Sequence, residues 1–200
     1  MGCDIHTYVE IKKHVNNEEK WVSADYYKKN PYYDGVDDYE KQFNIVHIFS
    51  DRDYGLFSIL ADVRNYGENT PICDPKGLPD DCCDEIKEEY EDWLGDGHSH
   101  SYFTLKELKD YVTTHKTIKR SGMISERAAI NLDTNNIKPD CWCQMTNQVG
   151  WVFREWDDEF TGLDRIIRKI TERLLDILYI SENRVDEFSD KIRLVFWFDN

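Results

Sequence analysis

Two Asp-x-His pairs are the groups of this chain best suited to chemistry. Residues two apart on a strand share a face, so Asp4 and His6 can point the same way, and Asp96 with His98 repeats that spacing. Two such pairs supply the oxygen and nitrogen ligands that suit zinc, manganese or iron. The sequence therefore leaves a divalent transition metal open, with the candidate ligands Asp4, His6, Asp96, His98 and His100.

The same groups also fit a pocket that binds a ligand without metal. Loops held by rigid elements are common places for binding sites, and arginine forks recognise phosphates and carboxylates. The structural alternative is that Asp4 and His6 bond to one another or to the backbone, and that the serines cap the next helix. The candidate ligand-binding residues are Asp4, His6, Arg64, Asn65, Asp96, His98, Ser99, Ser101 and Tyr102. For Arg52, considered by itself, we expect an ion pair with a carboxylate rather than a role in ligand binding.

Length and charge limit the function classes. A chain of 200 residues and 23.8 kDa predicts a single domain over residues 1–200. Its formal net charge of −15 argues against general nucleic-acid binding, which needs lysine and arginine to neutralise phosphates. Such a charge leaves open an acidic module that mimics nucleic acid and occludes a basic protein surface. Walker, nucleophile-elbow and Rossmann glycine motifs do not occur.

Hydropathy and cysteine spacing predict a protein that neither crosses a membrane nor is exported. The sequence contains no apolar run near the roughly 18 residues that a membrane span needs, and Asp4, His6 and Glu10 interrupt any signal peptide. The six cysteines include no C-x-x-C pair, so we expect reduced thiols rather than a disulfide framework or a structural zinc site.

Periodicity predicts the elements that must position these groups. Alternation over residues 3–12 and a second run over 20–24 predict an N-terminal hairpin, and the apolar run 192–198 predicts an interior strand that pairs with the first. Four helices are expected, over 54–63, over 81–93, from Thr104 onward and over 161–180. Ser50 with Asp53 and Thr104 with Glu107 have the spacing of capping boxes for the first and third of these helices. Residues 25–44, 70–79 and the 95–102 stretch read as loops, and 131–156 as short strands between turns. Together they predict an α+β fold, in which about four helices pack a small mixed or antiparallel sheet with an N-terminal hairpin and a C-terminal strand.

Several blocks spread over nearly the whole chain carry a resemblance. They are MGCDIH at residues 1–6, YGLFSILADVRN at 54–65, GLPD at 77–80 before the acidic helix that ends in Trp93, DGHS with SY at 96–102, and RLVFWFDN at 193–200. The chain resembles a family of uncharacterised proteins encoded by bacteriophages and prophages. The Asp-x-His start and the 97–100 tetrad are also similar to the two ends of the calcineurin-like metallophosphoesterase signature, whose central Gly-Asp and Gly-Asn-His-Asp/Glu blocks have no counterpart here.

The resemblance to phage proteins implies an accessory protein in the cytoplasm of the infected bacterial host. Such proteins often counter host defence, which implies binding and sequestration of a nucleotide-derived immune signal, of the cyclic oligonucleotide or ADP-ribose type. Two alternatives stay open: a metal-dependent phosphoesterase that acts on such nucleotides, and an acidic nucleic-acid mimic that inhibits a host defence protein. The sequence also leaves a homo-oligomer open, and it does not establish whether the chain is an enzyme.

Overall fold

The computed structural model describes residues 2–36, 41–93 and 95–199. Met1 and Asn200, which end two of the quoted blocks, and residues 37–40 of the expected loop lie outside the described residues. The chain divides into two compact units, each described by itself: unit 1 is Met1–Arg52, Pro75–Asp110 and Asp164–Asn200, and unit 2 is Asp53–Asp74 and Tyr111–Leu163. A single domain over 1–200 stays a prediction.

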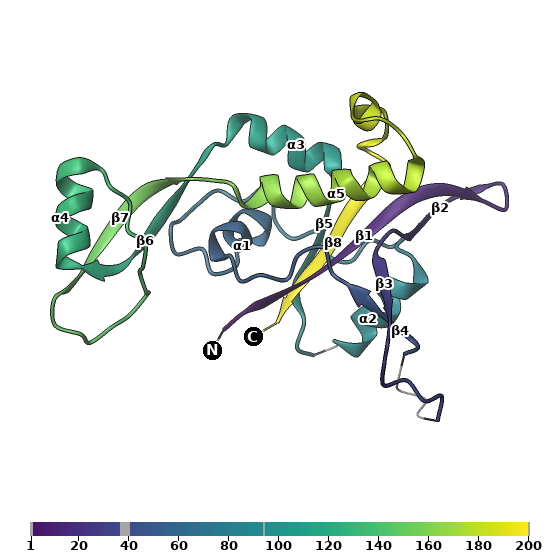
Figure 1. Ribbon diagram of the computed structural model, residues 1–200, viewed down its shortest axis with the longest axis horizontal. Coiled ribbons are helices and arrows are strands. Elements are labelled where there is room, and N and C mark those ends of the chain that lie inside the picture. Colours follow the sequence, from purple (N-terminus) through teal and green to yellow (C-terminus); the bar gives the residue numbers. More distant parts are fainter. Residues whose placement is uncertain (1, 37–40, 94, 200) are drawn as a thin grey trace. The chain divides into compact units, whose positions relative to one another are not determined.

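Unit 1 is built on a four-stranded antiparallel sheet with the strand order β2-β1-β8-β5. Asn16 and Asn17, both at positive φ, form the turn of the predicted hairpin. The last strand is interior and pairs with the first, as the sequence predicts (Figure 1). The strands are β1 (Asp4–Val15), β2 (Glu18–Ser23), β5 (His98–Thr104) and β8 (Ile192–Asp199).

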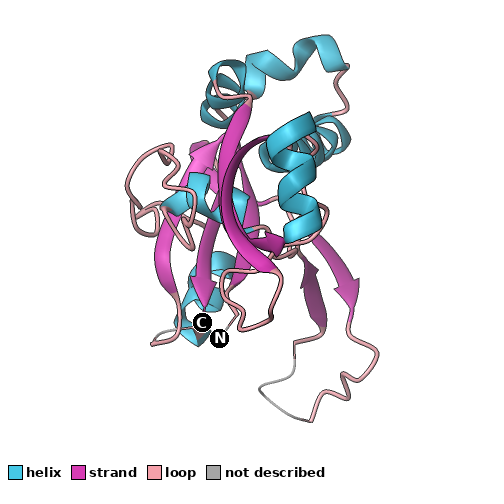
Figure 2. Ribbon diagram, turned by 90° about the vertical axis from the view of Figure 1, so that its left-hand side faces the viewer, coloured by secondary structure: helices cyan, strands magenta, loops and turns pink. Residues whose placement is uncertain are grey.

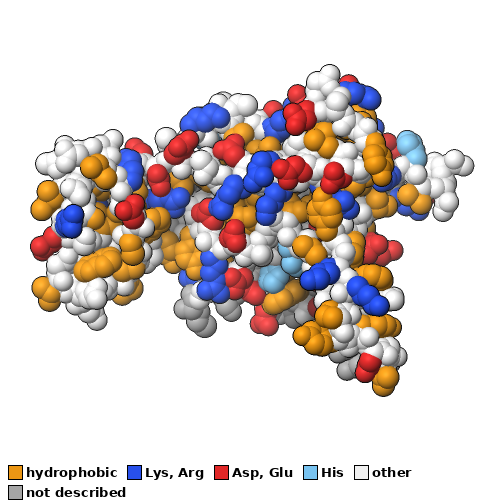
Figure 3. All heavy atoms as spheres, viewed as in Figure 1, with side chains coloured by type: hydrophobic (Ala, Val, Ile, Leu, Met, Phe, Trp, Pro, Cys, Tyr) orange, Lys and Arg blue, Asp and Glu red, His pale blue; other side chains and the backbone are white. Residues whose placement is uncertain are grey.

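Two helices lie on different sides of these strands (Figure 1). Helix α2 (Asp84–Asp92) packs Ile86 into a cluster that contains Tyr8 and Trp197 of the sheet. Helix α5 (Gly162–Leu178) buries the predicted apolar stripe, with Ile166 and Ile170 fully enclosed. Its opposite face shows basic and acidic side chains interspersed (Figure 3), so both amphipathic helices are confirmed.

The expected loop over 25–44 is wrong in part, because its two ends pair. Strands β3 (Tyr26–Lys29) and β4 (Phe43–Val46) form a two-stranded sheet of their own (Figures 1 and 2), and Ile45 of β4 packs against the cluster that contains Tyr8 and Trp197. Tyrosine favours strands. The partner of β3 lies beyond the turn signals, however, so the local sequence pattern does not reveal that β3 pairs with β4.

The stretch 95–102 is also not a loop between helices, because residues 98–104 form β5 at the edge of the sheet. Ser99 adopts φ +52°, and the register with β8 shifts between His98 and Ser101. Such a bulge interrupts the alternation. A run of histidine and serine has little strand propensity of its own, so the strand depends on pairing with the apolar β8.

Unit 2 contains a two-stranded antiparallel sheet of β6 (Thr117–Ser125) and β7 (Trp151–Glu159). Helix α4 (Glu126–Asn135) packs Ala129 and Leu132 against Ile124 and Trp156. The prediction of short strands over 131–156 is therefore wrong at its start, where α4 ends, and right only for the strand that begins at Trp151. Helix α1 (Tyr54–Ala61) also belongs to this unit, capped by Asp53 rather than Ser50, with Asp53 accepting from the Leu56 amide at 3.2 Å.

Helix α3 (Leu105–Thr114) begins at the predicted capping box. Glu107 accepts from the Thr104 amide at 2.7 Å, and the Glu107 amide donates to the Thr104 hydroxyl at 3.1 Å. A 3-10 helix, η1 (Glu182–Phe188), leads into β8. The small α+β fold is thus confirmed. None of the helices in the described part of the chain combines the length and apolar character that a membrane crossing requires.

Asp25 lies between β2 and β3, and its carboxyl group is buried, with 2% of the residue's surface exposed. Its Oδ1 accepts from the Val9 amide at 3.0 Å, while its Oδ2 is buried and has no hydrogen-bond partner among the described residues. Burial raises the pKa of Asp25 to about 8, outweighing the Val9 bond and the charge of Arg173, which favour the carboxylate. The folded protein therefore keeps a proton on Asp25 at neutral pH.

Substitution Asp25→Asn should remove one source of pH-dependent stability. Between pH 4 and pH 8 the unfolded chain has released the Asp25 proton and the folded chain has not, so this group lowers the free energy of unfolding as pH rises, by at most about 1.4 kcal/mol per pH unit. We expect urea unfolding at pH 5.5 and pH 8.5 to show the variant gaining stability over the wild type at the higher pH. Asp80→Asn, on an exposed residue, is the matched control. An equal gap at both pH values would contradict a protonated Asp25.

Candidate functional site

The polar side of β1 continues across the sheet as a row of paired polar and aromatic groups. His6 lies opposite Trp197, and Glu10 lies opposite Arg193. This is the face that α2 covers, through the cluster that holds Tyr8. The unusual polar alternation of the first strand therefore points into an interior rather than into solvent.

Glu10 and Arg193 form a buried ion pair at the centre of this row. Their side chains are 0% and 4% exposed, and Arg193 Nε donates to Glu10 Oε2 at 2.7 Å. The other oxygen, Oε1, accepts from the Cys83 amide at 2.5 Å, just before α2. One carboxylate thus joins both the sheet and the covering helix, and the charge of Arg193 is compensated inside the fold.

Arg193 also contacts groups at the protein surface. Its guanidinium carbon lies 3.9 Å from the Trp21 ring centroid and 5.4 Å from that of Tyr102. Nη1 donates to Asp81 Oδ1 at 2.8 Å, and the Trp21 indole donates to Asp81 Oδ2 at 3.0 Å. Burial alone would raise the pKa of Asp81, but these bonds outweigh it and the pKa is lowered.

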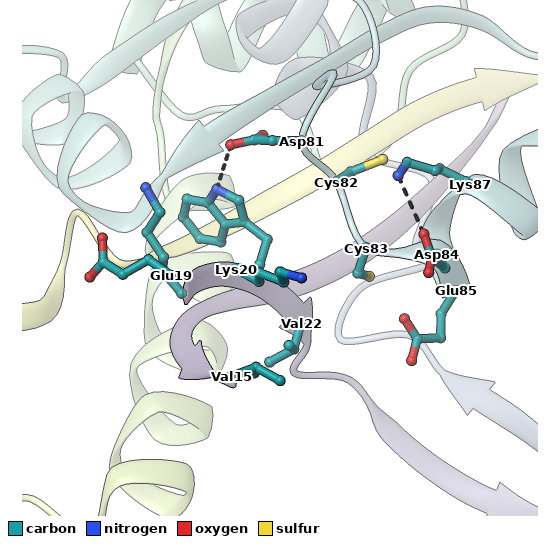
Figure 4. Close-up of a pocket in the computed structure, with 12 residues that line it drawn as sticks. Val15, Glu19, Lys20, Val22, Asp81, Cys82, Cys83, Asp84, Glu85 and Lys87 are labelled. Carbon is teal, nitrogen blue, oxygen red and sulfur yellow. Dashed lines mark hydrogen bonds and ion pairs between the residues drawn. The ribbon is translucent and has the colours of Figure 1, made fainter. Parts of the chain in front are cut away.

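A cavity of about 530 Å³ opens beside this group, within unit 1 (Figure 4). Side chains from the β1–β2 hairpin form one side, and the segment leading into α2 forms the other. The volume falls within the range of small-molecule sites. The lining residues include three lysines and four carboxylates: Lys12, Val15, Glu19, Lys20, Trp21, Val22, Asp81, Cys82, Cys83, Asp84, Glu85 and Lys87.

The two thiols of this pocket are poor nucleophiles. Burial and the nearby Glu10 carboxylate raise the pKa of Cys82 to about 11 and shift the pKa of Cys83 further in the same direction. Because the thiolate is the reactive form, both groups remain protonated near neutral pH. They contribute polarizable surface rather than covalent chemistry.

The side chains of Asp4 and His6 have different partners, although Asp199 contacts both residues and accepts from the Asp4 amide at 3.2 Å. Asp4 accepts two bonds from Arg52, at 2.5 and 2.6 Å, which confirms the ion pair expected for that arginine. This bonding lowers the pKa of Asp4. His6 Nε2 lies 3.2 Å from Asp199 Oδ2, and its ring lies 4.1 Å from that of Trp93.

His98 and His100 are held in β5 among aromatic rings. The His98 ring stacks on Phe198 at 6.0 Å, and its Nδ1 lies 3.0 Å from the Ser99 hydroxyl. His100 contacts Tyr90 edge to face at 4.9 Å, and burial, aided by the charge of His98, lowers its pKa. A neutral, partly buried imidazole at this position packs against the sheet.

The other predicted residues have identifiable structural contacts or lie at the surface. The Ser101 hydroxyl accepts from the Lys76 amide at 3.2 Å, Tyr102 contacts Arg193, and Asp96 is exposed. Asn65 belongs to unit 2, where its side chain bonds to Asp62 and Asn69 within the turn after α1. Its neighbour Arg64, at φ +52°, lies in the same turn.

The structure does not bring the predicted residues to the 530 Å³ pocket, since none of them is in its lining. Across the described ranges, no group of three or more His, Cys, Asp or Glu side chains is arranged to hold a metal ion. Sequence reasoning missed Glu10, Trp21, Asp81 and Arg193. One signal for Arg193 was available, because it is the single charged residue within the apolar run 192–198.

Comparison of the chain with protein-family models, with curated proteins and with solved structures finds no match.

Substitution Glu10→Gln should strongly destabilise the fold. It leaves the buried Arg193 charge without its enclosed counter-ion, a loss of about 3–5 kcal/mol in comparable pairs. Urea unfolding monitored by tryptophan fluorescence measures it, with Glu19→Gln on the exposed part of the same hairpin as the control, expected within about 0.5 kcal/mol of wild type.

Replacing both partners should be milder than replacing one. The double variant with Glu10→Met and Arg193→Met removes both charges together, and a buried pair can often be exchanged for apolar groups with little loss. If Glu10→Gln unfolds at the wild-type urea concentration, the Glu10–Arg193 ion pair does not stabilise the fold.

Proposed function

We propose that this chain binds a small nucleotide-derived ligand in the pocket between the β1–β2 hairpin and α2, and that it holds the ligand without turnover. The observation that carries the proposal is the cavity of about 530 Å³ in which Trp21 lies among three lysines. An aromatic ring beside cationic groups suits a base and a phosphate together.

The charges around the pocket support a ligand with both donors and acceptors. Among the described residues, the ion pairs of Lys20 and Lys87 are with the exposed carboxylates of Glu18 and Asp84. Pairs of this kind contribute little stability, so their ammonium groups can turn to a phosphate at low cost. The lining carboxylates suit the amino group of a base and the hydroxyls of a ribose, which donate hydrogen bonds.

Binding without turnover is supported by the state of the nucleophiles. The thiols of Cys82 and Cys83 are protonated near neutral pH, because burial raises their pKa values. No histidine, the usual general acid–base group near neutral pH, is among the described residues that line the pocket. Its protein groups suit recognition better than proton transfer.

Sequestration of a signal gives such binding a role. The resemblance to phage and prophage proteins supports a ligand made by an infected bacterium, of the cyclic oligonucleotide or ADP-ribose type. A ligand held in the pocket would be withheld from the host defence protein that responds to it. This role needs one binding event for each molecule of signal, and no chemical step.

Substitution Trp21→Leu should weaken nucleotide binding by about tenfold or more, because stacking of a base on an aromatic ring contributes about 1–3 kcal/mol. Isothermal titration calorimetry with cyclic dinucleotides, ADP-ribose and AMP measures the affinity. Tyr32→Leu, on an aromatic residue that is 82% exposed and outside the pocket, should bind as the wild type does.

His98→Ala separates this pocket from the histidine residues that the sequence suggests. His98 does not line the cavity, so binding should be retained. Absence of binding of every nucleotide to the wild type, or loss of binding in His98→Ala with Trp21→Leu unaffected, would overturn the proposed site.

A further inference from the structure

Arg193 is an interior residue with one partner at the surface. Its side chain is 4% exposed, whereas that of Asp81, which it contacts at 2.8 Å, is 63% exposed. The other partner, Glu10, is fully enclosed and also fixed by the Cys83 amide. Of the two carboxylates, only Asp81 can leave Arg193 and pass directly into water.

The guanidinium has unused binding capacity next to Asp81. Nε serves Glu10 and Nη1 serves Asp81, while Nη2 is buried and has no hydrogen-bond partner among the described residues. An arginine fork binds an oxyanion most strongly through two parallel bonds from its nitrogens. Asp81 makes only one such bond, because its second oxygen accepts from the Trp21 indole at 3.0 Å.

We propose that Asp81 occupies the place of a phosphate group of the ligand, and that this phosphate displaces Asp81 from Arg193 and from the Trp21 indole. The inference rests on the proposed function, since Asp81 and Trp21 line the same pocket, and it names the group that anchors the ligand. The phosphate receives donors from Nη1 and Nη2 of Arg193 and from Nε1 of Trp21.

The exchange is favourable because the leaving carboxylate of Asp81 is mostly exposed to water, whereas Arg193, which receives the phosphate, is buried. Asp81 gives up its pair with Arg193, but its own carboxylate is 63% exposed and is readily hydrated when it leaves. The incoming phosphate gains a bidentate, charge-assisted contact with a guanidinium held by the two aromatic rings. Glu10 remains in place, so the charge of Arg193 is compensated before and after the exchange.

The test is a titration of Asp81→Ala with inorganic phosphate at constant ionic strength, followed through the Trp21 indole N–H resonance. We expect Asp81→Ala to bind phosphate about tenfold more tightly than the wild type, since a competing internal anion has been removed. Asp84→Ala is the matched control, because it removes the same charge from the same pocket lining, and Asp84 pairs with Lys87 rather than Arg193. It should change phosphate affinity by less than about threefold, the effect of a screened surface charge.

A second variant tests the donor from Trp21 without disturbing Arg193. Trp21→Phe in the Asp81→Ala background keeps an aromatic ring but loses the indole donor, and it should weaken phosphate binding several-fold. Calorimetry replaces the lost indole signal in that variant. Equal gains in Asp81→Ala and Asp84→Ala, or no phosphate binding to Asp81→Ala, would overturn the inference.

The same data separate this inference from the proposed function. If nucleotides bind the wild type and Asp81→Ala shows no gain for phosphate, the pocket stands and the role of Asp81 fails. If phosphate binds tightly to Asp81→Ala while no nucleotide binds either protein, the anion site stands and nucleotide recognition fails.

Discussion

The charge of Arg193 is the constraint around which unit 1 is arranged. This guanidinium lies in the interior strand β8, where water does not reach it. A buried charge is tolerated only when it is paired and its hydrogen bonds are satisfied. Glu10 supplies the opposite charge across the strand pair, in the observed register of β1 against β8 that places the two residues directly opposite, while Nη2 of Arg193 keeps no hydrogen-bond partner among the described residues. A slip of one residue would turn Glu10 to the other face of the sheet.

The same carboxylate connects the sheet to its covering helix. Glu10 accepts from the Cys83 amide, and Cys83 immediately precedes α2. The first amides of a helix have no partner within the helix, so a neighbouring carboxylate is well placed to accept a bond near them. Helix α2 therefore covers the polar face of β1 through a hydrogen bond to the Glu10 carboxylate at one end, while Ile86 packs against Tyr8 and Trp197. The pocket lies between the β1–β2 hairpin and the start of this helix.

The histidine residues show how motif and tertiary role can differ. His6 pairs with Asp199, while His98 and His100 pack against Phe198 and Tyr90. The side chains of Asp4 and His6 pair with Arg52 and Asp199 rather than with one another or with the backbone. The Nε2 atoms of His98 and His100 are buried and have no hydrogen-bond partner among the described residues. The groups that surround the pocket come from segments with no recognisable motif, which is why composition and spacing did not identify them.

The sequence by itself determined the elements whose signals are local. The alternation of β1, the Asn16-Asn17 turn, the Thr104/Glu107 cap and the apolar stripe of α5 each lie within one short segment. The interior place of β8 also followed, because an apolar run on both faces must be covered on both sides. The tertiary structure alone decided the strand β5, the ribbon of β3 and β4, and the meeting of Glu10, Trp21, Asp81 and Arg193. These depend on partners far apart in the chain, and the free energy of pairing a buried charge is not visible in any local pattern of residues.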